Sequence, residues 1–458
     1  MKKIFLMSIA VMALLSVFAW SIMPGRKHDN KVELRWITDD NPARRDQIAT
    51  FNKLHPDMNL LLDPGTSQKT IVQVLAGVGP ELFDSYGPSQ IESYVKSDVC
   101  LDVTDKLKEA GIDVNNDVWK AVHSTFIFNG RVYGFPTNVS CAGMLYNKTA
   151  FEKLGMPYPK GPWQWKDFLP VAQKLTLRDK SGKVTQYGFM FEWSYFPQFS
   201  LQWGGHWYSP DGTKCILNSK ENADALQFMY DLIYKYHVAP TPNEEASLAS
   251  QGGWGTGLIN LFGAGRSATV LGGRWMLCNL RNFEGLRVGA AELPYQVNRV
   301  YWGYGRATVV NKYSPKKDQA FKFLLYMAGK EYNELVNHQA DGIAPMVKYA
   351  YTDKYLHDKD YPEENNNDVW RDTMKYSRPY ESSPFIDATN AERILYKQVD
   401  LVKTGQKKPA DALRTAEELT NELIQKNLRK DPSLMRLYQQ LISKQAKSPV
   451  VEQQEGRK

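Results

Sequence analysis

Cysteine is scarce in this chain, with 4 residues in 458. Cys100, Cys141, Cys215 and Cys278 are far apart, and none belongs to a C-x-x-C pair. This spacing argues against a zinc site or a thioredoxin-like redox site. We therefore predict no metal and no other cofactor. Spacing alone does not decide whether any two of the four form a disulfide, and buried thiols are the default expectation.

Motifs of the common catalytic and nucleotide-binding sites are also missing. The chain contains no G-x-S-x-G, no H-E-x-x-H and no P-loop. Gly255-Thr256-Gly257 lacks the third glycine and the preceding strand of a dinucleotide fingerprint. Tryptophans combined with Asp and Glu also occur in glycoside hydrolases, but no pair of carboxylates can be assigned acid and nucleophile roles. We expect no enzyme, with a glycoside hydrolase as a remote alternative.

Charge of one sign is not concentrated anywhere. The net charge is +7 and the sequence pI is near 8.9, but Lys and Arg are scattered. Nucleic-acid binding normally requires a basic stripe or patch, so no nucleic-acid partner is expected.

Only one long apolar run occurs. It extends from Ile4 to Trp20 after Lys2 and Lys3, as in a secretory signal. Cleavage could follow Ala19, but the run is also long enough to remain as a membrane anchor. Residues 1–23 are therefore interpreted as a signal peptide or an N-terminal anchor. Either form places the chain in the periplasm or on the outer face of the inner membrane. No Cys lies near the end of this run, so lipoprotein attachment is not indicated.

Aromatic residues are abundant: 12 Trp, 25 Tyr and 19 Phe. The length predicts two or three packed units. Residues 31–38 alternate apolar and polar as a strand does, and Asp40 or Asn41 can cap the helix that Pro42 begins. A second strand follows at 58–62, which makes a βαβ unit and favours a parallel sheet in an α/β fold.

Several blocks of sequence, in order, carry a family likeness. They are LRWITDDNPARRDQIATFNKLHPDMNLLL, AGVGPELFDSY, NGRVYGFPTNVSCAGMLYNKTAFEKLGMPYPKGPWQWKDFLPVAQKLT, FGAGRSATVLGGRW and YWGYGRATVVNKYSPKKDQAFKFLLYMAG. With them the chain resembles the extracellular solute-binding proteins of family 1, which deliver sugars to ABC importers and include the maltose-binding proteins. The likeness extends from about Val32 to Asn427. Glu81 stands where the family usually has Asp.

The resemblance implies a two-lobed periplasmic-binding-protein fold of type II, with a ligand cleft between lobes that a hinge joins. It places lobe 1 at residues 31–137 plus 303–345 and lobe 2 at 138–302 plus 346–446, followed by a polar tail at 447–458. The chain would cross between the lobes near 136–139, 301–303 and 343–345. Closure of the lobes on a ligand is the expected mechanism.

Candidate ligand contacts in lobe 1 follow the carboxyl ends of strands, where open α/β sheets bind their ligands. Carboxylates there can accept sugar hydroxyls and aromatic rings can stack on a pyranose, although each residue could instead be a helix cap, a turn residue or part of the core. These candidates are Trp36, Asp39, Asp40, Asp84, Ser85 and Tyr86.

Further candidates lie at the crossings and in lobe 2. Asn138 falls at the first crossing, and Trp302 and Tyr304 at the second. Trp193 and Tyr195 follow a strand predicted at 187–191. In Gly272-Gly273-Arg274-Trp275, the resemblance implies that Trp275 stacks on the ligand. Arg274 replaces a commoner small residue or Pro, and its guanidinium could bind a carboxylate, so an acidic sugar is an alternative ligand.

The sequence thus predicts a solute-binding protein of an ABC importer that binds a mono- or oligosaccharide. Its expected partners are a small sugar and the permease subunits in the membrane, and it is expected to be a monomer. A receptor for another polar solute, or a tethered receptor that feeds a membrane sensor, remains the alternative.

Overall fold

The structure is a computed structural model that describes residues 31–63, 69–248, 256–379 and 381–447. The predicted signal or anchor segment and nearly all of the predicted polar tail lie outside these residues. Within the described part of the chain, none of the helices has the length and apolarity of a membrane span.

The first sheet forms around the N-terminal βαβ unit. Its strands follow the order β13-β12-β3-β1-β2, and β6 pairs with β12. β1 is parallel to both β2 and β3, whereas β12 is antiparallel to β3 and β6. The bounds are β1 Val32–Ile37, β2 Met58–Asp63, β3 Leu82–Ser85, β6 Gly134–Cys141, β12 Tyr301–Val310 and β13 Ser377–Arg378.

The predicted N-terminal strand, helix and parallel strand are confirmed. Helix α2 (Pro42–Leu54) begins with Pro42, and the Asn41 side chain caps it by accepting a hydrogen bond from the amide of Arg44 at 3.0 Å. Phe51 of α2 packs edge-on against Phe323, with ring centroids 5.2 Å apart. Phe323 comes from α14 (Lys317–Ala328), so the C-terminal half of the chain completes the core of this lobe.

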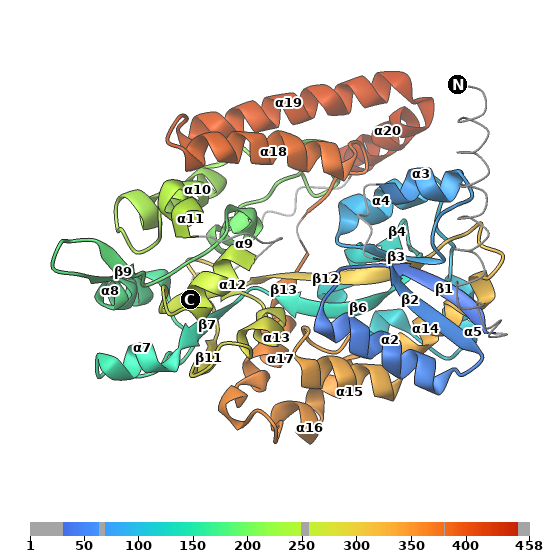
Figure 1. The fold of residues 1–458 in the computed structure, drawn as a ribbon. Helices are drawn as coiled ribbons and strands as arrows, with labels where there is room; N and C mark the ends of the chain where they lie inside the picture. The colour runs from blue at the N-terminus through green and yellow to red at the C-terminus, as the bar shows by residue number, and fades with distance from the viewer. Residues whose placement is uncertain (1–30, 64–68, 249–255, 380, 448–458) are drawn as a thin grey trace, which may run out of the picture.

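Helices cover both faces of the first sheet. In Figure 1, α2 and α14 lie on one side and α3 and α4 on the other. The helical segments of this part of the molecule are α3 Thr70–Leu75, α4 Pro88–Lys96, α5 Thr104–Glu109, α6 Val114–Asp117, η2 Lys120–Thr125, α14 Lys317–Ala328 and α15 Lys330–Gln339, with a small hairpin of β4 Ile127–Phe128 and β5 Arg131–Val132.

The second sheet is smaller and antiparallel, in the order β10-β7-β11. Helices surround it, and α18 and α19 lie side by side above α10 (Figure 1). The bounds are β7 Gly143–Asn147, β10 Thr269–Gly272, β11 Val288–Ala291, α7 Lys148–Lys153, α8 Trp165–Leu175, β8 Leu177–Arg178, β9 Val184–Gln186, η3 Trp193–Tyr195, α9 Phe196–Trp203, α10 Lys220–Tyr234, α11 Pro242–Leu248, α12 Thr256–Gly263, η4 Arg274–Met276, α13 Leu277–Leu280, η5 Val347–Tyr351, α16 Asp353–Leu356, η6 Pro362–Glu364, α17 Asn367–Lys375, α18 Ala388–Lys403, α19 Pro409–Lys430 and α20 Pro432–Lys447.

Two long strands connect the two sheets. β6 and β12 run side by side in Figure 1 and pair from Gly134–Val309 to Cys141–Gly303. A third segment joins them, because Val139 and Ile343 exchange both backbone hydrogen bonds, at 3.2 and 2.8 Å. Gly342, just before this contact, has a φ of +104°. The three predicted crossings therefore lie together, while the exact lobe boundaries stay a prediction.

One predicted strand differs from the expectation, and two other segments have notable local structure. Gly134-Phe135-Pro136 begins β6. Pro136 has no N–H for the ladder, and the β6–β12 register shifts beside it. The predicted strand at 187–191 makes only isolated bridges, at Tyr187 and Met190. The segment at 358–368 contains η6 and the start of α17.

Candidate ligand site on the crossing strands

One face of β12 organises the candidate site. Trp302, Tyr304 and Arg306 alternate along the strand and therefore point to the same side. On β6, Ser140 lies opposite Tyr304, and Asn138 lies opposite Arg306. Side chains that face each other across a strand pair share a face, so the two crossing strands present one continuous polar and aromatic surface.

An aromatic cluster occupies one half of this surface. Tyr304 is at its centre: its hydroxyl lies 3.0 Å from that of Tyr195 and accepts a hydrogen bond from Trp275 Nε1 at 3.1 Å. The Trp302 ring lies 4.8 Å from Tyr304 and 5.6 Å from Tyr195, between centroids. Trp275, Trp302 and Tyr304 are each half-buried. Half-buried rings with hydrogen-bonded polar atoms suit stacking on a sugar ring.

Gly273 permits this cluster to form. A Cβ atom at Gly273 would lie 2.5 Å from the Tyr304 hydroxyl and 2.7 Å from Trp275 Cδ1, and it would also collide with Ser140 Oγ. Side chains cannot tolerate contacts this close, so only glycine lets η4 approach β12.

A charged cluster occupies the other half of the surface. Asp84, at the end of β3, is buried and accepts hydrogen bonds from Trp36 Nε1 at 2.8 Å, Thr38 Oγ1 at 2.5 Å and Thr308 Oγ1 at 2.8 Å. Arg306 Nε lies 3.2 Å from Asp84 Oδ2, and Arg306 Nη1 forms an ion pair with Asp39. Burial raises the pKa of Asp84 to about 6, although the three hydrogen bonds oppose this change.

A second arginine completes the charged cluster. Arg44 of α2 is buried and pairs with Asp341 at 2.6 Å and with Asp39 at 3.3 Å. Asn138 donates a hydrogen bond to the backbone carbonyl of Asp341 at 2.7 Å. The charged cluster therefore joins the ends of β1 and β3 to the first and third crossings.

Some predicted contacts in lobe 1 take other places. Trp36 has no exposed surface and packs against Phe323 at 4.9 Å, so in this structure its indole offers no face to a ligand. Ser85 is also fully buried, and its hydroxyl donates to the carbonyl of Gly87. Asp40 is exposed and pairs with Arg45 at 2.9 Å. Only Asp39, Asp84 and Tyr86 lie beside the guanidinium of Arg306, with the ring of Tyr86 5.7 Å away.

Two predicted contacts in lobe 2 also differ. Trp193 is buried and packs near Phe191, with ring centroids 6.0 Å apart. Arg274 is buried, and its three nitrogens donate to the Gly342 carbonyl at 2.6 Å, the Asn337 carbonyl at 2.8 Å and Asn367 Oδ1 at 2.8 Å. Arg274 therefore fastens η4 to the end of α15 and to the third crossing, and each of its three guanidinium nitrogens is already bonded to a protein oxygen.

Sequence reasoning missed Arg44 and Arg306. Arg44 lies in the first turn of a helix, where an arginine usually faces solvent. Arg306 lies two residues beyond Tyr304 on the same strand face. Because Trp302, Tyr304 and Arg306 are spaced two residues apart along one strand, this alternation could have identified Arg306 as a neighbour of the two aromatic candidates.

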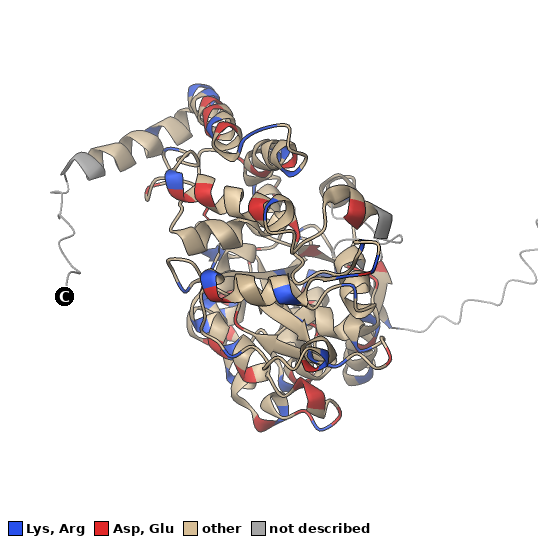
Figure 2. Ribbon diagram, turned by 90° about the vertical axis from the view of Figure 1, so that its left-hand side faces the viewer, with Lys and Arg blue, Asp and Glu red and all other residues tan. Residues whose placement is uncertain are grey.

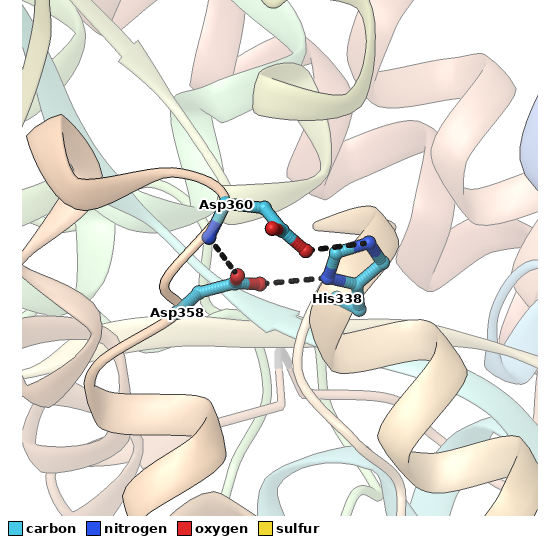
Figure 3. Close-up of side chains that lie close together, drawn as sticks. All are labelled: His338, Asp358 and Asp360. Carbon is cyan, nitrogen blue, oxygen red and sulfur yellow. Dashed lines mark hydrogen bonds and ion pairs between the residues drawn. The ribbon is translucent and has the colours of Figure 1, made fainter.

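A separate group of side chains has metal-ligating chemistry. His338, Asp358 and Asp360 lie close together at the end of α15 (Figure 3). Asp358 is 2.9 Å from Nδ1 of the imidazole, and Asp360 is 3.9 Å from Nε2. One ligand atom from each residue lies within 4.8 Å of the others, but the imidazole is already paired with both carboxylates, and the Asp360 side chain is 76% exposed. The arrangement instead attaches the 358–360 segment to α15.

Two sheets joined by paired crossing strands, with aromatic and charged side chains gathered on those strands, define the two-lobed periplasmic-binding-protein fold of type II. A family model described as bacterial extracellular solute-binding protein matches residues 37–334, and the chain belongs to this family. The name of this family implies export from the cytoplasm.

Curated relatives include the sn-glycerol-3-phosphate-binding periplasmic protein UgpB of Escherichia coli K12. It is 25% identical over 345 residues, which are 71% of this chain and 75% of the relative. The protein of the same name from Salmonella paratyphi A is 23% identical over 82% of this chain and 88% of its own.

Solved structures share the fold. The substrate-binding protein Lmo0181 of Listeria monocytogenes, in complex with cycloalternan, superposes with a TM-score of 0.74 at 22% identity, over 86% of this chain and 98% of its own. UgpB of Mycobacterium tuberculosis, in complex with glycerophosphocholine, gives 0.69 at 16% identity over 91% and 99%. The type II fold predicted from the sequence is confirmed.

Proposed function

We propose that this protein is the extracytoplasmic receptor of an ABC importer, that it binds a carbohydrate between its lobes, and that it does not alter the ligand chemically. The observation that carries the proposal is the aromatic cluster of Tyr195, Trp275, Trp302 and Tyr304, which adjoins the charged cluster on the crossing strands. A sugar ring offers an apolar face to the rings and hydroxyls to the charged groups.

Family membership and the relatives support the same proposal. The relatives named above are binding proteins, and one of their structures holds an oligosaccharide. The crossing strands carry the proposed site, so a ligand held there would contact the segments that move when the lobes close. Binding that favours the closed state would then drive closure.

Charge distribution fits a receptor that is not a nucleic-acid protein. In Figure 2, Lys and Arg alternate with Asp and Glu over the ribbon instead of collecting on one face. We infer that the partners are a small solute and the permease subunits, with the protein acting as a monomer.

Mass analysis of the mature N-terminus would separate a cleaved signal from a retained anchor.

Calorimetry against a panel of mono- and oligosaccharides tests the proposal, with glycerol 3-phosphate and a polyamine included. At least one saccharide should bind, with 1:1 stoichiometry and without any product detectable by mass spectrometry. If every saccharide failed and the polyamine bound, the protein would be a receptor for another polar solute. Hydrolysed oligosaccharide would instead favour the glycosidase alternative.

A further inference from the structure

The guanidinium of Arg306 is buried, but its hydrogen bonding with the described residues is incomplete. Its side chain is 6% exposed, yet its Nε and Nη2 atoms make no hydrogen bond with any described residue. A buried guanidinium normally uses most of its five N–H donors, because an unpaired buried donor costs free energy. Arg306 therefore has donor capacity that a ligand can use, beside the half-buried ring of Tyr304.

Asp84 holds this guanidinium but does not satisfy it. Three neutral donors already bond to the Asp84 oxygens, and the Nε of Arg306 faces them at ion-pair distance without hydrogen-bond alignment. Asp84 is enclosed by the protein, so its effect on a ligand acts through Arg306. In contrast, the carboxylate of Asp39 is 39% exposed and can face a ligand directly.

The charges around Arg306 decide which ligand chemistry fits. Two guanidinium groups, of Arg44 and Arg306, lie among three carboxylates, of Asp39, Asp84 and Asp341. An incoming phosphate or carboxylate would meet uncompensated negative charge in a poorly hydrated site. A hydroxyl group fits better, because it can accept from Arg306 and donate to Asp39 at the same time.

We propose that Arg306 and Asp39 form a pair that recognises ligand hydroxyls, and that this pair selects uncharged sugars or polyols over anionic and phosphorylated ones. Asp84 is a positioning residue that holds Arg306 in place. This inference rests on the proposed function and specifies its ligand class. It also distinguishes the chain from the relatives named for glycerol 3-phosphate.

The test is calorimetry on the full chain with matched pairs of probes: glucose against glucuronate and glucose 6-phosphate, and glycerol against sn-glycerol 3-phosphate, with maltotriose added. In the wild-type protein, the uncharged member of a pair that binds should bind at least tenfold more tightly than its anion. Arg306→Gln should weaken binding of the uncharged probe at least tenfold. Arg287→Gln, a surface change in a pair with Glu152, should leave it unaltered.

A second variant keeps the test decisive if Arg306→Gln does not fold. Asp39→Asn changes a partly exposed group and should reduce the preference for the uncharged probe, because it removes one negative charge and leaves only a neutral amide oxygen to accept from the ligand hydroxyl. Asp84→Asn should weaken binding of the uncharged probe, and adding it to Arg306→Gln should cause little further loss, because Asp84 acts through Arg306; a direct ligand contact by Asp84 would make the two losses additive.

Three outcomes would contradict, in turn, the selectivity for uncharged ligands, the role of the Arg306–Asp39 pair and the proposed carbohydrate function. Tighter binding of a phosphate or uronate by the wild-type protein would overturn the selectivity but leave a solute receptor. Unchanged affinity for the uncharged probe in both Arg306→Gln and Asp39→Asn would remove the pair from the site. Failure of every saccharide and polyol would overturn the proposed carbohydrate function itself.

Discussion

Two buried arginines, Arg274 in η4 and Arg306 in β12, stand in contrasting surroundings. Both side chains are almost fully enclosed, but Arg274 donates from all three nitrogens to protein oxygens, whereas two nitrogens of Arg306 make no hydrogen bond with the described residues. Burial is therefore alike in the structural Arg274 and in Arg306, the proposed ligand arginine, whereas the number of hydrogen-bonded nitrogens differs.

The largest expected effect is on Arg274. Arg274→Ala would remove the Arg274 donors of the Gly342 carbonyl and the Asn367 amide oxygen and one of the two donors of the Asn337 carbonyl, and we expect it to lower the free energy of unfolding by about 3 kcal/mol or more. Urea denaturation would measure this change. The exposed Arg287→Ala should cost about 0.5 kcal/mol or less. If Arg274→Ala changed the free energy of unfolding little but weakened ligand binding strongly, Arg274 would be a ligand-binding arginine and not a structural one.

A pH effect at Asp84 should come next. The folded state raises the pKa of this carboxyl to about 6, so between about pH 4 and 6 the folded protein holds a proton that the unfolded chain releases. The wild-type protein should therefore lose stability relative to Asp84→Asn as the pH rises through this window, on the order of 3 kcal/mol in total. Denaturation at several pH values would measure it, and parallel curves would contradict the shifted pKa.

Gly273 tests how tightly η4 packs on β12. Gly273→Ala places a methyl group against Tyr304 and Trp275, and we expect a loss of about 1–3 kcal/mol in unfolding free energy, together with weaker ligand binding. Gly265→Ala is a useful control, because its Cβ would meet nothing within 4 Å, although its positive φ adds some strain of its own. Equal effects at both positions would show that packing against the aromatic cluster is not the cause.

The smallest expected effect in energy concerns the aromatic cluster. Trp275→Ala should weaken ligand binding by roughly tenfold, about 1.4 kcal/mol, with little change in thermal stability, because the ring is only half-buried. Trp193→Ala is the matched control: this ring lies in the core, so its loss should lower stability more than affinity. An unchanged affinity in folded Trp275→Ala would remove Trp275 from the site.

Much of the fold and part of the site follow from short-range patterns. The alternation in residues 32–37, the cap at Asn41 and the proline after it predict β1 and α2 because these signals act within a few residues. The aromatic residues at 195, 275, 302 and 304 were also identified as candidates from the sequence, and the structure brings their rings together. Whether they contact a ligand stays a prediction.

Other features depend on contacts between residues far apart in the chain. Trp36 looked suitable for stacking because it ends a strand, but Phe323 covers it from a helix that lies hundreds of residues later. From the sequence, Arg274 was a candidate for binding a ligand carboxylate, but in the structure its guanidinium donates to the carbonyls of Asn337 and Gly342. The sequence by itself determined most of the elements, the family and the residue types available for binding. Only the tertiary structure decided which buried polar groups are satisfied, because hydrogen-bond partners are set by distances in space and not by spacing along the chain.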